Sequence, residues 1–368
     1  MLNLNDFMNT GIKNIINTAG RFYTDSRRGR SFMIRMASTL RSEAKMREQY
    51  EQQGIHIPPF LIASIASSCN LHCAGCYARA NGGCSSGDVQ GEMVVDDWQR
   101  VFTEASEIGV SFILLAGGPP FPGSVSTGWS RLGTLAAKYD NLFFPIFTNG
   151  TMIDDEYLKL FDEHRNLIPV LSIEGNEKET DKRRGSGVSK RIKMVAEELK
   201  GRGILYGTSI TVTSVNKDKV ADSRFVHNLK EQGCGLIFYV EYVPAEKGTE
   251  YLILNSQELK ELQERISMLR VDKKNKGMIM LSFPGDEEAM GGCLAVGRGF
   301  FHINAGGGAE PCPFSPYSVM NLKKETILET LQSSFFKNVR EISAAEVLNH
   351  KGGCTLFQCE DEVKQAVI

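Results

Sequence analysis

The residues most able to do chemistry are three cysteines, Cys69, Cys73 and Cys76, in the segment SSCNLHCAGCYARA. Their spacing, C-x3-C-x2-C, lets three thiolates on one loop surround a single iron–sulfur cluster. Three protein ligands rather than four leave one iron open to an outside ligand, and an open iron is typical of a catalytic cluster. One alternative stays open, which is a zinc site that takes His72 as its fourth ligand.

A second set of cysteines lies in the last quarter of the chain. Two distant pairs of thiols suit a closed tetrahedral site, for zinc or for a fully ligated iron–sulfur cluster. Either metal would hold together a glycine-rich segment that has few apolar residues of its own. The four members of this set are Cys293, Cys312, Cys354 and Cys359. The two remaining cysteines have no spacing partner: Cys234 is interpreted as a small buried residue, and Cys84 stands on a loop near the first set.

The chain has 368 residues, of which 42% are hydrophobic and 23% charged, an ordinary globular composition. Its net charge of -2 gives no electrostatic reason to expect a nucleic-acid partner. The cysteine count of 9 is odd and the N-terminus lacks a secretory signal pattern, so thiol or metal chemistry in a reducing compartment is favoured over a disulfide framework. We therefore expect a cytoplasmic protein without a membrane-spanning helix.

Residues 1–55 predict a basic helical arm, because Lys and Arg outnumber acids there and apolar residues recur at helical intervals. Two interpretations of this arm stay open. The plainer one packs it against the main domain, and the other gives it peripheral contact with an anionic membrane surface or a partner.

The main part of the chain must position the cysteines, and its pattern alternates apolar runs with amphipathic runs. Strands are expected at 60–66, 110–116, 142–147, 168–173, 205–212 and 236–243, with the clearest helices near 96–108 and 188–199. This order predicts an α/β fold with parallel strands, as a partial (β/α)6 barrel of the TIM type. Chemistry in such barrels collects at the carboxyl ends of the strands, where the first cysteine set falls.

After the barrel we expect a helix at 255–272, a strand at 277–283 and a small hairpin around FFHIN. The predicted boundaries are 1–55 for the arm, 56–250 for the barrel, 251–290 for a helix and strand connection that completes the barrel side, and 291–368 for a small C-terminal domain.

The first cysteine loop resembles the signature loop of the radical S-adenosylmethionine (radical SAM) superfamily, with Tyr77 in the aromatic position that follows the third cysteine. The resemblance implies a 4Fe-4S cluster on the three cysteines, whose open iron binds SAM through its amino and carboxylate groups. It also implies reductive cleavage of SAM and hydrogen abstraction from a substrate by the resulting 5'-deoxyadenosyl radical.

The resemblance continues after the second strand, in Ala116-Gly117-Gly118-Pro119-Pro120. This segment is similar to the Gly-Gly-Glu-Pro turn of the superfamily, so Gly117 and Gly118 are expected to contact the SAM amino group. Glycines permit that close approach of backbone to ligand. Pro119 replaces the glutamate of the family, which puts a carboxylate contact to SAM at this position in doubt.

After the fourth strand the chain resembles the Ser-Ile-Asp-Gly and later Arg-Gly pattern of the peptide- and protein-modifying branch. Ser172 is then expected to bind the SAM ribose or carboxylate, and Arg184 to pair with the carboxylate. Glu174 stands where the family has aspartate. On the sixth strand, Glu241 is a candidate catalytic residue, as a substrate ligand or proton acceptor, if it faces the barrel interior.

The half-pattern Cys293-x13-Gly307-x4-Cys312 resembles the opening of the SPASM and Twitch domains that follow radical SAM barrels. The chain lacks the further cysteines of a full SPASM domain. The resemblance therefore implies one auxiliary 4Fe-4S cluster on Cys293, Cys312, Cys354 and Cys359, in a Twitch-like domain. A structural zinc in that site is the alternative.

The resulting prediction is a radical SAM enzyme that takes electrons from a low-potential donor such as flavodoxin or ferredoxin. Its substrate stays unidentified among peptides or proteins, lipids and small molecules. Residues 1–55 do not show the strand-rich pattern of a leader-peptide-binding domain, whereas a lipid substrate suits their basic character. The rival from another class is a zinc-binding interaction module.

Overall fold

A computed structural model describes residues 18–23, 27–84, 91–117, 129–346 and 353–367. Its strands form one ten-stranded sheet in the order β10-β9-β8-β1-β2-β3-β4-β5-β6-β7. The strands are β1 (Phe60–Ser64), β2 (Phe112–Ala116), β3 (Phe144–Thr148), β4 (Leu167–Ile173), β5 (Tyr206–Val212), β6 (Cys234–Glu241), β7 (Ile279–Phe283), β8 (His302–Ile303), β9 (Gly308–Glu310) and β10 (Met320–Asn321).

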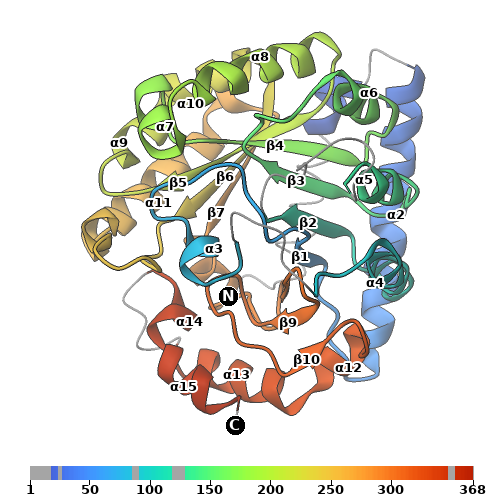
Figure 1. The fold of residues 1–368 in the computed structure, drawn as a ribbon. Helices are drawn as coiled ribbons and strands as arrows, with labels where there is room; N and C mark the ends of the chain where they lie inside the picture. The colour runs from blue at the N-terminus through green and yellow to red at the C-terminus, as the bar shows by residue number, and fades with distance from the viewer. Residues whose placement is uncertain (1–17, 24–26, 85–90, 118–128, 347–352, 368) are drawn as a thin grey trace.

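Strands β1 to β7 are parallel neighbours in chain order, and the crossovers between them place helices on the outer side of the sheet (Figure 1). The sheet does not close, because β7 and β10 are its two edges. The predicted partial barrel is therefore confirmed. All six strands expected within residues 60–243 are present, as is the strand expected at 277–283.

The helices of the barrel follow from amphipathic repeats and capping residues. In α4, one face buries Trp98, Val101, Phe102, Ala105 and Ile108, and the helix ends at Gly109 in a left-handed conformation. The helices are α2 (Arg27–Gln52), α3 (Tyr77–Ala80), α4 (Val95–Ile108), α5 (Trp129–Ala137), α6 (Asp155–Glu163), α7 (Glu177–Arg184), α8 (Val188–Gly201), α9 (Lys217–Val220), α10 (Ser223–Glu231), α11 (Ser256–Val271), α12 (Ile327–Gln332), α13 (Ser334–Ala345), α14 (Thr355–Gln358) and α15 (Glu360–Gln365). Short 3-10 turns follow β6, α11 and β7 as η1 (Glu250–Leu252), η2 (Lys273–Asn275) and η3 (Glu288–Met290).

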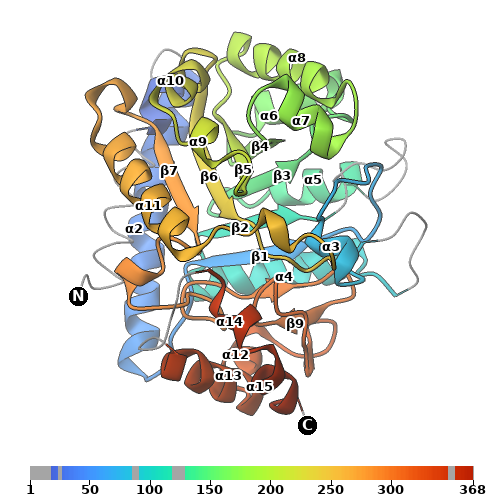
Figure 2. The ribbon, with the colours of Figure 1, turned by 90° about the vertical axis from the view of Figure 1, so that its left-hand side faces the viewer.

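The described part of the N-terminal arm is helical and packs against the barrel. Helix α2 runs along one side of the molecule in both views (Figures 1 and 2). Tyr23, Phe32 and Met36 share an apolar cluster with Phe112 and Phe143, which stand near the starts of β2 and β3. The arm thus covers the amino ends of the strands, opposite the end where chemistry is expected. No helix in the described part of the chain has the length and apolar content to cross a bilayer.

The C-terminal segment continues the same sheet. Strand β8 pairs in parallel with β1, and β8 and β9 form the predicted hairpin. Helices α12 to α15 gather at one end of the molecule (Figures 1 and 2). Phe335 and Phe336 of α13 are buried in the core that also holds the barrel, and Phe336 packs edge-on against Phe301. The C-terminal segment therefore shares the core of the barrel. The domain boundaries remain predictions.

Candidate functional site

A cavity of about 470 Å³ opens inside the partial barrel. Its walls are mostly apolar, with aromatic and aliphatic side chains from several strands. Its polar groups come from the carboxyl ends of the strands and the loops that follow them, as the fold predicts. The polar and sulfur-bearing lining residues are Cys69, Cys73, Cys76, Tyr77, Thr148, Asn149, Ser172, Arg183, Arg184, Ser209, Thr211, Glu241, Tyr242, Ser282, Asp286 and Glu287.

The structure brings the three cysteines of the first loop to the same cavity wall. All three side chains are half-buried. A hydrogen bond with Cys84 lowers the pKa of Cys69 to about 6, and burial raises the pKa of Cys73. Cys84 is itself buried, so it packs behind the loop rather than standing free on it. The loop therefore presents three thiols to one open space.

Two side chains hold this loop, Arg79 through its backbone and Asn149 through a side chain. Arg79 donates hydrogen bonds to the carbonyls of Cys69 and Leu71 at 3.1 and 2.8 Å. The Asn149 amide, at the end of β3, donates to the side-chain oxygen of Asn70 at 2.9 Å. These bonds tie both the start of the loop and its neighbouring strand end to one frame, so the thiols have defined positions.

Gly117 follows β2 and lines the cavity, and its predicted contact with SAM stays a prediction. Its φ is +120°, and a Cβ there would lie 2.5 Å from the carbonyl oxygen of Ala66. Only glycine fits this close approach between the first two strand ends. Gly118 and Pro119, the other residues singled out in this turn, lie outside the described residues.

Ser172 lies near the end of β4 and also lines the cavity. Its hydroxyl is 3.0 Å from the hydroxyl of Ser209 on the neighbouring strand β5. The two strands pair in register at this point, which places the two hydroxyls side by side. This pair offers adjacent donors and acceptors to a polar ligand.

A buried ion-pair cluster follows β4. The Glu174 side chain is 3% exposed and its Oε1 accepts from Arg183 at 2.6 Å and from Arg184 at 2.5 Å. The capping box of Asn176 and Glu179 starts α7, whose last turn carries both arginines back toward Glu174. The cluster has two guanidinium groups for one carboxylate, so its local charge is positive and suits an anionic ligand group.

Glu241 ends β6 and lines the cavity, with the residue 4% exposed. Burial, and then the neighbouring Glu287, raises its pKa to about 7. Burial raises the pKa of Glu287 to about 7 as well. The amide of Gln263 bonds the Glu241 carboxylate, and this amide occupies the space that a side chain at Gly285 would need. Glu241 therefore meets the condition set for its role, since it faces the barrel interior, and its catalytic role stays a prediction.

The second cysteine set is more deeply buried than the first. Cys293, Cys312 and Cys354 lie close enough to perturb one another, and burial raises the pKa of each. Cys359 stands at the other end of α14 from Cys354. Burial raises its pKa, followed by Glu346 and Glu362. The structure therefore groups three of the four predicted ligands and leaves Cys359 beside acidic neighbours.

Tyr77 connects the two cysteine sets. It begins α3 directly after Cys76, and its ring packs edge-on against Phe314 with centroids 4.9 Å apart. Phe314 follows Cys312 by two residues and stacks on Phe283 at the end of β7. The predicted cofactor-binding residue thus also forms a contact between the first loop and the C-terminal segment.

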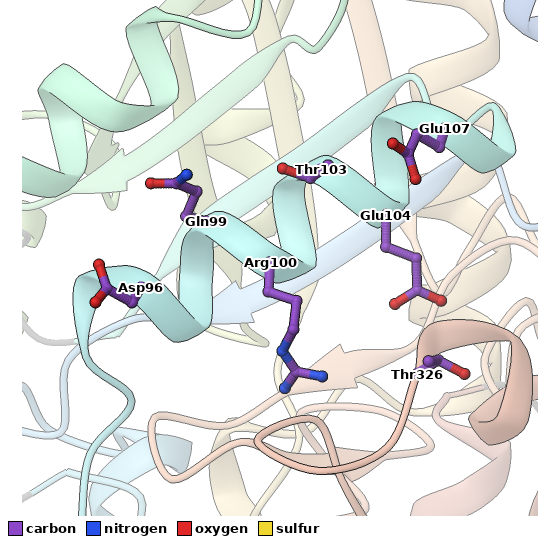
Figure 3. Close-up of a pocket in the computed structure, with 7 residues that line it drawn as sticks. All are labelled: Asp96, Gln99, Arg100, Thr103, Glu104, Glu107 and Thr326. Carbon is purple, nitrogen blue, oxygen red and sulfur yellow. The ribbon is translucent and has the colours of Figure 1, made fainter.

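A second, polar cleft of about 410 Å³ lies on the outer face of α4 (Figure 3). Arg100 and Glu104 point from α4 toward the segment that carries Thr326. Arg100 donates to the carbonyl of Leu322, and Glu104 accepts from the backbone of Leu328 at 3.2 Å. These contacts attach the C-terminal segment to the barrel. The lining of this cleft includes no cysteine.

The residues at the inner cavity fit an iron–sulfur cluster with a bound cosubstrate. Three thiols from one loop are an incomplete ligand set for a cubane, and they face a cavity rather than packed protein. The hydroxyls of Ser172 and Ser209 and the arginine cluster supply polar contacts beyond the thiols. No group of three or more His, Cys, Asp or Glu in the described ranges is arranged to hold a single metal ion. As metal ligands, both cysteine sets therefore remain predictions.

Sequence reasoning missed several residues at this site, among them Arg183, Ser209 and Glu287. Side chains along a strand point alternately to its two faces. Ser209 and Thr211 of β5 are two residues apart, so the sequence could have placed them on the same face. The motif assigns a role to Arg184 and none to its neighbour Arg183, so Arg183 was not singled out. Glu287 lies on an irregular segment after β7, and no local pattern indicates that this carboxylate is buried.

Comparisons with known proteins agree with this geometry. Residues 64–225 match the family described as the radical SAM superfamily. The Fe-coproporphyrin III synthase of Methanosarcina barkeri is 25% identical over 215 residues, which cover 57% of this chain and 50% of that protein. The sporulation killing factor maturation protein SkfB of Bacillus subtilis is 27% identical over 169 residues, which cover 45% of this chain and 39% of that protein. The matched region spans half or less of these relatives' own length.

Solved structures show the same fold. SuiB of Streptococcus suis bound to S-adenosylmethionine has a TM-score of 0.66 at 16% identity, covering 88% of this chain and 78% of that one. The protein anSMEcpe with bound AdoMet has a TM-score of 0.61 at 19% identity, covering 84% of this chain and 96% of that one. Because the identities are low, these structures establish the shared architecture alone.

Proposed function

We propose, from the premise that this chain belongs to the radical SAM superfamily and is an enzyme of it, that the inner cavity is its active site. A 4Fe-4S cluster and SAM are the cofactors of the superfamily. When bound, they supply a 5'-deoxyadenosyl radical that abstracts hydrogen from a substrate. The observation that carries the assignment is that Cys69, Cys73 and Cys76 line one cavity together with the strand-end residues that the resemblance singles out.

The residues around the cavity have separable tasks in this proposal. The three thiolates hold the cluster, and the backbone at Gly117 leaves room for the cosubstrate. Ser172 and its neighbour Ser209 bind polar groups of SAM. Arg184 faces the cavity and pairs with the SAM carboxylate, while Glu174 keeps the guanidinium in place. Tyr77 packs beside the third thiolate.

The apolar walls support a substrate that buries a hydrocarbon portion beside the cluster, because desolvating such a group is favourable. They also exclude water from a reactive radical. Glu241 is placed in the wall to bind the substrate or to accept a proton from it. One relative is named for an iron porphyrin and another for maturation of a killing factor, so small molecules and peptides both stay among the candidate substrates. A low-potential flavodoxin or ferredoxin would supply the electron.

The C-terminal cysteines are proposed to hold one auxiliary 4Fe-4S cluster. The grouping of Cys293, Cys312 and Cys354 next to the cavity wall at Glu287 supports this proposal. Cys359, at the other end of α14, is the proposed fourth ligand. Zinc in the same position is the competing occupant.

Anaerobic reconstitution with iron and sulfide tests the proposal. We expect iron–sulfur absorption, about eight irons per chain if both sites hold cubanes, and release of 5'-deoxyadenosine when SAM and dithionite are added. The matched control is Cys234→Ala, because Cys234 is buried at the start of β6 and does not line the cavity. A colourless protein that binds zinc and leaves SAM intact would instead support an interaction module.

A further inference from the structure

The turn between Cys73 and Cys76 consists of Ala74 and Gly75, and residues from distant elements hold it. The Ala74 N–H donates to the carbonyl of Arg183 at 3.0 Å, and the Arg183 Nε donates back to the carbonyl of Ala74 at 3.0 Å. The Gly75 N–H donates to the Glu246 carboxylate at 2.7 Å. Two of the three peptide units between the two cysteines are therefore fixed from outside the loop.

Gly75 is required by this arrangement. Its φ is +66°, and a Cβ there would lie 2.3 Å from the hydroxyl oxygen of Tyr242. The Tyr242 side chain, which follows β6 and lines the cavity, thus fills the space beside the turn. The turn has packing on one side and hydrogen bonds on the other, which leaves it little freedom to move.

Arg183 is the strongest of these anchors because its guanidinium reaches three separate elements. Nη1 donates to Glu174 after β4 at 2.6 Å and to the Thr211 hydroxyl of β5 at 2.7 Å. The side chain is 17% exposed, and that of Glu174 is 3% exposed. A planar guanidinium that donates to several fixed acceptors is held rigidly, and the flexible ammonium of a lysine cannot form the same set of hydrogen bonds. The strand ends therefore set the position of the cysteine turn through one side chain.

We propose that Arg183 is a positioning residue that fixes the separation and direction of the Cys73 and Cys76 thiolates. The inference rests on the proposed function, because it concerns how this loop holds its cluster. Neither the cysteine pattern nor the resemblance assigns a role to Arg183. It acts on the cluster through the Ala74–Gly75 backbone, in the way that outer groups orient metal ligands.

The test uses the full chain, reconstituted anaerobically, in wild-type, Arg183→Gln, Arg183→Lys and Lys182→Gln forms. Lys182 is exposed in the same helical turn, so its replacement matches the charge change without touching the loop. Iron release to a chelator is followed through the EPR signal that responds to added SAM, so iron at the C-terminal cysteines does not contribute. Circular dichroism checks that each form is folded.

We expect Arg183→Gln to lose this signal about tenfold faster than wild type and to change its EPR line shape. Arg183→Lys should fall between them, since it keeps the charge beside Glu174 but cannot also bond Ala74, and Lys182→Gln should match wild type. If Arg183→Gln is unfolded, Arg183→Lys decides. Folded variants with wild-type release rates and line shapes would overturn the inference alone. A wild-type protein without a SAM-responsive signal would overturn the proposed function, and the inference with it.

Discussion

The two cysteine sets differ in what surrounds them. Cys69, Cys73 and Cys76 are half-buried, line a cavity and are positioned by hydrogen bonds to loop backbone. Cys293, Cys312 and Cys354 are buried, and apolar side chains pack around them. A cluster at the first set can meet a cosubstrate, whereas one at the second is enclosed by protein. If both sets hold clusters, this difference predicts ligand exchange at the first set and a structural or electron-transfer role at the second.

The largest expected effect separates the two sets by activity. In Cys76→Ala, release of 5'-deoxyadenosine should fall to the level of a control without enzyme, because the open cluster lacks a ligand. In Cys312→Ala, SAM cleavage should persist. Chromatography of the reaction with SAM and dithionite measures both. Equal loss of SAM cleavage in the two variants would contradict the prediction that only the first set is needed for this reaction.

Iron content gives the next effect. Cys312→Ala should retain about four of about eight irons, because one cubane remains. Its melting temperature should also drop, because buried thiol ligands contribute to folding when the metal is bound. Iron analysis and calorimetry under argon test this. Full iron retention, with zinc lost instead, would assign the second set to a structural zinc.

Glu241 lies in the wall of the cavity that the first set lines, and it interacts electrostatically with Cys354 of the second set. Its titration therefore reports on the region between the two sets. Its pKa is about 7 in the fold against an ordinary 4.5, with burial as the main cause. The folded protein keeps this proton longer than the unfolded chain does. The protonated carboxyl therefore contributes to the free energy of unfolding. This contribution is complete below about pH 4.5 and is lost as the pH rises to about 7.

Glu241→Gln cannot ionise and should escape that loss. From pH 5 to pH 8, its free energy of unfolding should rise relative to wild type by up to about 3 kcal/mol. Urea unfolding at both pH values measures the change, with the exposed Glu264→Gln as control. A pH-independent difference between Glu241→Gln and wild type would show that the carboxyl titrates normally.

The smallest effect concerns the aromatic contact that joins the sets. An edge-to-face pair such as Tyr77 and Phe314 contributes about 1 kcal/mol beyond its buried area. A double-mutant cycle of Tyr77→Leu and Phe314→Leu should show a coupling of that size, while Tyr77→Leu with the distant Phe225→Leu should be additive. Additive free energies for the first pair would mean that the two sets are mechanically independent.

Local patterns predicted the barrel well, because apolar runs and helix repeats are encoded by neighbouring residues. Helices α12 and α13 were missed although their signals are present: Thr326 and Glu329 form a capping box, and Ser333 caps the next helix. The placement of the first cysteine set at the cavity followed from its position after the first strand, while its role as a ligand set stays a prediction. The deep burial of Glu287 and the anchoring by Arg183 did not follow from local patterns, because they depend on contacts between residues far apart in the chain.

The pairing of β8 with β1 has a consequence for synthesis of the protein. Ile62 aligns with His302, so the first strand of the barrel gains its outer neighbour only after most of the polypeptide has left the ribosome. Contacts of such long sequence separation form slowly. Until then, the hydrogen-bonding groups on that flank of β1 are bare and can recruit a strand from another chain. Versions truncated before residue 300 should consequently aggregate during expression, whatever their cysteine content.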